Sequence, residues 1–152
     1  MRSRVFVPMM LLGALAPATG CAPSRGGSQD VAPNGVLFEK GAVILTGTAL
    51  TDGPGSVLAA MSGKVPNFRV QRHEGRCPEI SLRNNVSLVP GGDVNPQVYV
   101  DGTRTSDTCI LETLRTVDVE RVEVYPQGFT TRPGYATHAH GLILVFMRSA
   151  GM

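Results

Sequence analysis

Short runs of apolar and polar residues along this 152-residue chain predict a small domain of mixed strands and helices. Runs typical of strands cover residues 42–46, 68–71, 80–83, 97–100 and 142–147. We expect residues 42–46 to form the first strand. Residues 142–147 are continuously apolar, so this run predicts a central strand that is buried on both faces.

Two further segments predict short helices. Ser56 can cap a helix over residues 57–62, which Gly63 and Pro66 would end. A second helix is expected over residues 110–115, and the valine spacing after it predicts a change from turn to strand near Arg121. The fold class is therefore α+β, with a mixed sheet of four to six strands and two short helices over residues 36–150.

The N-terminus has the pattern of an export signal. Arg2 and Arg4 precede the apolar run 5–15, which is too short to span a bilayer, and small residues follow it. Residues 1–20 are therefore predicted to be a signal peptide. Ala18 to Cys21 resembles a lipobox, so we expect Cys21 to carry lipid, including palmitate; cleavage after Ala18 would instead leave a soluble periplasmic protein.

Residues 21–35 are rich in Gly, Ser, Pro and Asn, and predict a flexible tether. Ala22 after the cysteine is similar to the sorting pattern of outer-membrane lipoproteins. We therefore expect a lipid-anchored protein of the outer membrane that faces the periplasm.

Charge gives no reason to expect a nucleic-acid partner. The chain has 14 basic and 12 acidic residues, and removal of Arg2 and Arg4 with the signal leaves 12 of each.

Two cysteines remain in the predicted domain, Cys77 and Cys109. In an oxidising compartment they can form a disulfide, which would close a loop of about 33 residues and stabilise the fold by roughly 3.5–4 kcal/mol at most. Two separate thiols are the alternative.

Candidate catalytic or metal-binding groups are few. His138 and His140 would face the same way on a strand and reach one metal, with Tyr135 or Asp107 nearby, but no carboxylate has a supporting spacing. We interpret His73 and Glu74 as part of an exposed turn rather than as an acid–base pair. Since nucleotide and hydrolase motifs are absent as well, we expect no enzyme activity, metal or cofactor.

Five motifs in order along residues 50–148 resemble the plug domain of TonB-dependent receptors. They are the helix and strand of 56–70, "ISLRN" at 80–84, "PQVYVDGT" at 96–103, the segment 110–124 that ends in "VDVERVEV", and "GLILVFMR" at 141–148. Asn67 and Asn84 stand where the family usually has Gly, and residues 126–140 match it poorly.

The resemblance implies motif positions at Arg83, Asp101, Gly102, Glu123 and Gly141. In receptors, the charged positions Arg83 and Glu123 are implied to contact the barrel wall. Without a wall, an internal ion pair or a solvated surface is the simpler interpretation.

A barrel that encloses a plug needs about 22 strands of ~10 residues, more than this chain offers. We therefore expect the chain alone not to be a transporter. The function expected is a non-enzymatic binding module whose partner is an envelope protein, either an outer-membrane barrel or an energy-coupling protein. An accessory protein that captures a small ligand for outer-membrane uptake is the alternative.

Overall fold

The computed structural model describes residues 35–52, 55–83 and 94–149. The predicted signal peptide, Cys21, almost all of the tether and Asn84 lie outside these residues.

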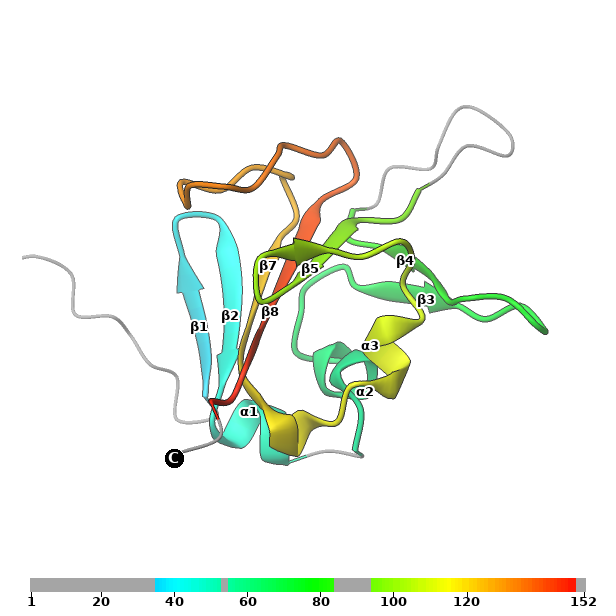
Figure 1. Cartoon of the computed structure of the whole chain (residues 1–152), viewed down its shortest axis with the longest axis horizontal. Helices are drawn as coiled ribbons and strands as arrows, with labels where there is room; N and C mark the ends of the chain where they lie inside the picture. Colours follow the sequence, from blue (N-terminus) through cyan, green and yellow to red (C-terminus); the bar gives the residue numbers. More distant parts are fainter. Residues whose placement is uncertain (1–34, 53–54, 84–93, 150–152) are drawn as a thin grey trace, which may run out of the picture.

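A mixed six-stranded sheet forms the centre of the fold (Figure 1). Its strands lie in the order β1-β2-β7-β8-β5-β6, and all neighbours are antiparallel except β5 and β8. The strands are β1 (Val36–Glu39), β2 (Ala42–Thr46), β5 (Gln97–Val100), β6 (Thr103–Arg104), β7 (Val119–Tyr125) and β8 (Leu142–Met147).

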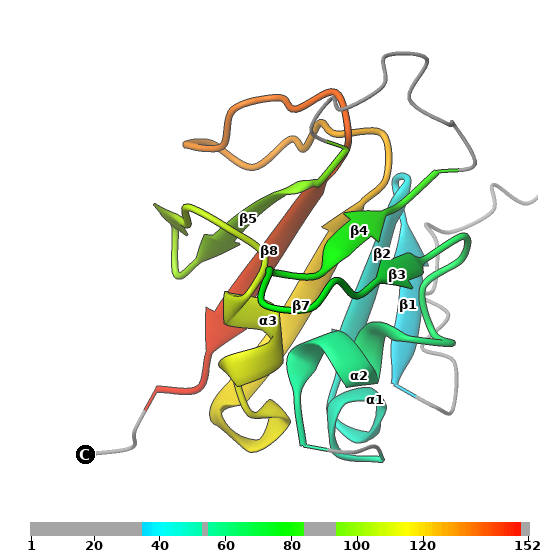
Figure 2. The ribbon, with the colours of Figure 1, turned by 90° about the vertical axis from the view of Figure 1, so that its right-hand side faces the viewer.

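The remaining elements lie on one face of this sheet, as Figure 2 shows. They are the helices α1 (Thr48–Thr51), α2 (Val57–Met61) and α3 (Ile110–Thr113), the 3-10 turn η1 (Thr116–Asp118), and the two-stranded sheet of β3 (Arg69–Gln71) and β4 (Glu79–Ser81). The main apolar core fills the space between them and the sheet. The α+β class and the mixed sheet are thus confirmed.

The predicted helix after Ser56 is present as α2. The Ser56 hydroxyl accepts a hydrogen bond from the Ala59 amide at 3.3 Å, which satisfies one of the amides left free at a helix start. Gly63, with φ of 80°, follows the helix end as expected.

The central position of β8 is also confirmed. It lies between β7 and β5, and the four residues Leu142 to Val145 are each no more than 1% exposed. Helices cover one face of this strand, and a second, smaller apolar cluster lies on the other.

The start of β7 differs from the expectation. The strand begins at Val119 rather than near Arg121, and its register with β8 shifts between these two residues. An extra residue in a strand changes the alternation of its side chains, so Val119 and Val122 both reach the core although they are three apart. This bulge explains why the spacing from Val119 to Val122 resembles that of a helical turn although both residues belong to a strand.

Three elements were not predicted. Strand β1 precedes β2, so residues 42–46 form the second strand, β6 follows the turn after β5, and α1 makes three α-helices where two were expected. Strand β1 and helix α1 have four residues each and β6 has two, too few for a periodic pattern to stand out. No helix in the described part of the chain has the length and apolar character needed to span a membrane.

Candidate functional site

A buried carboxylate lies on the sheet face that points away from the helices. Because alternate residues of a strand point to opposite faces, β7 directs Val122 and Val124 into the main core and Arg121, Glu123 and Tyr125 to the other face. The Glu123 side chain is only 1% exposed. A buried charge is costly unless it is paired and hydrogen-bonded, so its neighbours are decisive.

Arg132 is the main partner of Glu123. It donates from Nε to Oε2 at 2.7 Å and from Nη2 to Oε1 at 2.6 Å, a bidentate arrangement. The Tyr125 hydroxyl donates to Oε2 at 2.8 Å. Arg132 comes from the loop that joins β7 to β8, so this carboxylate holds the loop onto the sheet.

A second guanidinium, that of Arg121, lies on the same carboxylate. Its Nε is 2.9 Å from Glu123 Oε1, but this N–H does not point at the oxygen and donates to no described residue. The attraction is therefore a charge contact rather than a hydrogen bond. Both guanidiniums also lie over the Phe146 ring, at 4.7 Å for Arg121 and 5.2 Å for Arg132.

These contacts move two pKa values. Burial is the largest cause that raises the pKa of the Tyr125 hydroxyl, and the neighbouring Glu123 carboxylate adds to it. The hydrogen bond to Glu123 raises the pKa of Arg132 above its ordinary value. Arg132 therefore stays charged at any physiological pH, and a group that keeps its proton is more typical of a structural or binding role than of acid–base catalysis.

Arg83 holds the base of the same loop and does not pair with Glu123. Its Nε donates to the Pro126 carbonyl at 2.6 Å, and its Nη2 donates to Gln127 Oε1 at 2.8 Å. The internal ion pair of Glu123 is therefore made with arginines of β7 and the loop. Further along the loop, the His138 amide donates to the Gly128 carbonyl at 2.8 Å.

The other motif positions shape the backbone. Asp101 and Gly102 have φ angles of 45° and 81° in the turn after β5, and Asp101 Oδ1 accepts from the Met147 amide at 2.9 Å. Gly141 has φ of 108°, and a Cβ there would lie 2.6 Å from Leu82 Cδ1. These three residues fix turns and close packing, and they present no reactive group.

The disulfide between Cys77 and Cys109 is present, with Cα atoms 4.7 Å apart. It joins the residues before β4 to the start of α3. The Asp107 carboxylate lies close to both sulfurs. Bonded sulfurs offer no thiolate to a metal, so this group is a crosslink and not a metal centre.

His138 and His140 lie in a turn before β8, outside any strand. Their ring centroids are 5.8 Å apart, and within the described residues no third His, Cys, Asp or Glu joins them to complete a metal site. His73 lies 3.5 Å from Glu79, not Glu74; His73 is exposed and Glu79 is half-buried. Among the residues that the structure describes, no nucleophile or buried carboxylate is paired with these histidines.

No protein-family model and no curated protein matches the chain. Among solved structures, the fold is similar to part of a chain in the RagAB peptide importer in its "closed-closed" state. The TM-score is 0.56 at 22% sequence identity, over 73% of this chain. The match spans 12% of that chain, so this protein corresponds to a small part of the importer polypeptide.

The resemblance to the plug family singled out Glu123 but not its partners. The alternation in "RVEVY" puts Arg121 and Tyr125 on the same face as Glu123, so this pattern could have identified these two neighbours. Arg132 comes from an irregular loop whose path no periodicity describes, so its role required the structure.

Proposed function

We propose that this protein is a non-enzymatic binding module of the cell envelope, and that its partner is another envelope protein. The observation that carries this proposal is the similarity of its fold to a small part of an importer chain. In the importer such a fold lies within a larger polypeptide, and we propose that an envelope protein contacts the domain here.

The sheet face that carries Glu123 is the surface we assign to this partner, and we call it the outer face. The side chains of Glu123, Arg121, Tyr125 and Arg132, which we call the ion-pair cluster, lie on this face, and no helix of the described residues covers it. Beside the cluster, strands β1, β2 and β8 present half-buried apolar and polar side chains, namely Leu37, Ile44, Thr46 and Phe146. Aromatic and arginine side chains within a mixed apolar surface are typical of protein interfaces.

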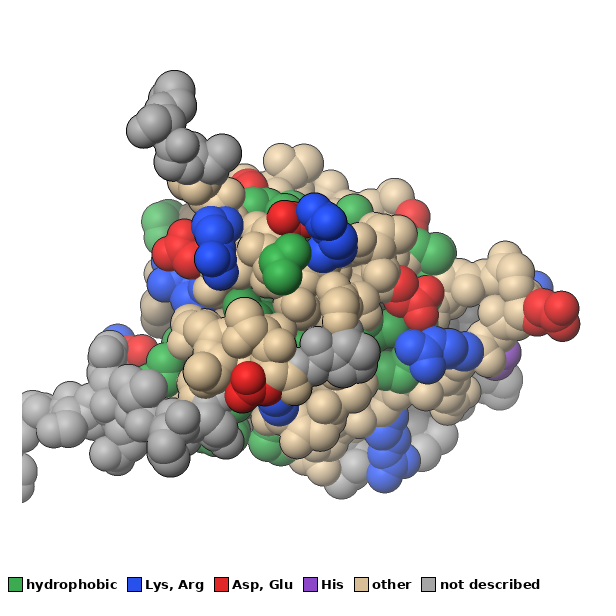
Figure 3. Space-filling view, turned by 90° about the horizontal axis from the view of Figure 1, so that it is seen from below, with side chains coloured by type: hydrophobic (Ala, Val, Ile, Leu, Met, Phe, Trp, Pro, Cys, Tyr) green, Lys and Arg blue, Asp and Glu red, His purple; other side chains and the backbone are tan. Residues whose placement is uncertain are grey.

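The distribution of charged side chains on the surface gives no support to a nucleic-acid partner. On the side seen in Figure 3, basic and acidic side chains of the described residues are interspersed and form no large patch of one sign. Binding to the phosphate backbone would require such a basic surface.

We further propose that Cys21 anchors the protein to the outer membrane, facing the periplasm. The apolar run before Cys21 and the Gly-rich and Ser-rich segment after it support this location. Cells supplied with labelled palmitate should incorporate it into the wild-type protein, and Cys21→Ser should abolish the label. Equal labelling of both proteins, or of neither, would contradict the anchor.

The proposed function is tested by chemical crosslinking of intact cells followed by affinity isolation of the tagged protein. A discrete envelope protein should be recovered as a covalent adduct. Recovery of no protein above the level of an untagged control would refute the proposal.

A further inference from the structure

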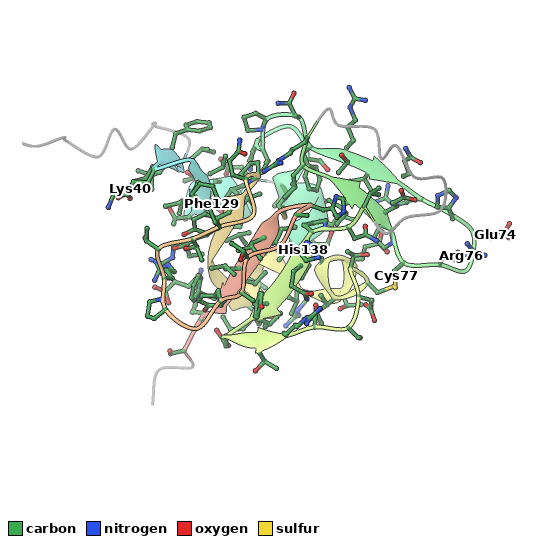
Figure 4. All side chains as sticks on the ribbon, turned by 90° about the horizontal axis from the view of Figure 1, so that it is seen from above. Lys40, Glu74, Arg76, Cys77, Phe129 and His138 are labelled. Atoms are coloured by element: carbon green, nitrogen blue, oxygen red, sulfur yellow. A yellow bond between two sulfur atoms is a disulfide. The ribbon has the colours of Figure 1, made fainter. Side chains whose placement is uncertain are left out.

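A small hollow opens beside the ion-pair cluster. The hairpin of β1 and β2 lines it with Lys40 and Ile44, β7 with Glu123, and the β7–β8 loop with Phe129 and Arg132. Figure 4 shows Lys40 and Phe129 at the same end of the molecule, away from the tip of the β3–β4 hairpin. Its space of about 160 Å³ is close to that of a cavity that binds benzene, and well below a drug-sized pocket.

The charged side chains that line this hollow balance in number: two cations (Lys40, Arg132) and two carboxylates (Glu39, Glu123). The preference for an anion or a cation therefore depends on which of these groups already have hydrogen-bond partners. Glu123 at the base is already occupied by its hydrogen bonds from Arg132 and Tyr125. It therefore offers little to a cationic ligand.

Donors remain available for an anion. Arg132 uses Nε and Nη2 on Glu123, and a guanidinium carries five N–H donors in all. Lys40 Nζ is 3.8 Å from Glu39 Oε1, beyond hydrogen-bond distance, and its side chain is 78% exposed. Ile44 and the 57% exposed Phe129 provide an apolar wall beside these donors.

We propose that this hollow binds a carboxylate attached to a short apolar group, no larger than one amino-acid residue. The carboxylate lies between the Lys40 ammonium and the Arg132 guanidinium, and the apolar part packs on Ile44 and Phe129. A short free carboxylic acid and the C-terminal residue of a peptide share this chemistry. The site is additional to the protein partner proposed above, and its binding does not require that partner.

The test is a titration of the isotope-labelled protein, followed by the amide signals of Lys40 and residues 129–132. The probes are N-acetyl-alanyl-leucine, its C-terminal amide, and isovalerate. The free acid should bind at least about tenfold more tightly than the amide, because the amide lacks the charge that strengthens these hydrogen bonds. Similar affinity for isovalerate would identify a short acid as the ligand, whereas a much higher affinity for the dipeptide would identify a peptide terminus.

Lys40→Asn is the informative variant. Lys40 has φ of 47°, which Asn adopts readily, so the turn is retained while the charge is lost. The affinity for the dipeptide should fall about tenfold. Arg76→Asn, which removes a cation at the tip of the opposite hairpin, should leave it unchanged (Figure 4).

Three results would each overturn the proposal. They are equal affinity of acid and amide, equal weakening by the two variants, and the absence of signal changes at these residues up to about 20 mM probe, a concentration at which even millimolar affinities saturate.

Discussion

Arg132→Met provides the sharpest test of the buried ion pair. The substitution removes both hydrogen bonds of the bidentate contact and keeps a side chain of similar length. Glu123, 1% exposed, then retains the Tyr125 hydroxyl and the charge of Arg121. We expect a clear loss of stability because a buried carboxylate loses its principal partner.

The magnitude follows from this geometry. Removal of one partner of a fully buried pair costs about 3–5 kcal/mol. Because the Arg132 side chain is 39% exposed and the Arg121 guanidinium remains in place, the expected loss in the free energy of unfolding is smaller, about 2–3 kcal/mol. For a domain of this size that corresponds to a fall in Tm of roughly 8–12 °C.

Urea unfolding followed by circular dichroism, with the disulfide intact, measures this loss. Glu123→Leu should be the milder variant, because the two arginines it leaves are partly exposed to water. The double variant should recover about 1–2 kcal/mol relative to the sum of the single changes. Additive losses, or an Arg132→Met protein as stable as wild type, would refute the assigned role of this pair.

Three other predictions concern stability. The raised pKa of Tyr125 means that the folded state keeps this proton when the unfolded chain loses it, so stability should decline above about pH 10, and Tyr125→Phe should reduce that decline in pH-dependent urea titrations; identical slopes would contradict this. Gly141→Ala should lower the free energy of unfolding by about 2–4 kcal/mol because the new methyl group meets Leu82, whereas Gly134→Ala, with φ of 91° but open space, should cost only about 1 kcal/mol; equal losses would exclude crowding as the cause. Reduction of the disulfide, which joins residues 32 apart, should cost about 2–4 kcal/mol by the same assay, and no change would show that the crosslink does not restrict the unfolded chain.

The sequence predicted the helices and strands whose own residues carry a clear local pattern. The Ser56 cap and the apolar spacing after it specify α2, and the continuous apolar run of β8 specifies its central position. The disulfide was expected from two cysteines in a chain with a predicted export signal. For α2 and β8 one short segment contains the information, and for the disulfide the number of cysteines does.

The parts that were missed depend on residues far apart in sequence. Strand β1 has four residues and is defined by its pairing with β2, and the early start of β7 depends on a bulge against β8. The partner of Glu123 comes from the loop where the resemblance to the plug family was poorest. Tertiary contacts, which no local pattern specifies, decide each of these features.

The central claim, that the outer face binds an envelope protein, is tested most directly by site-specific photocrosslinking in living cells. A photoreactive residue at Thr46 places the probe on the outer face, and one at the exposed Thr113 of α3 places it on the helical side. We predict one discrete adduct with an envelope protein from position 46 and none from position 113. The same adduct from both positions, or none from position 46, would contradict the account.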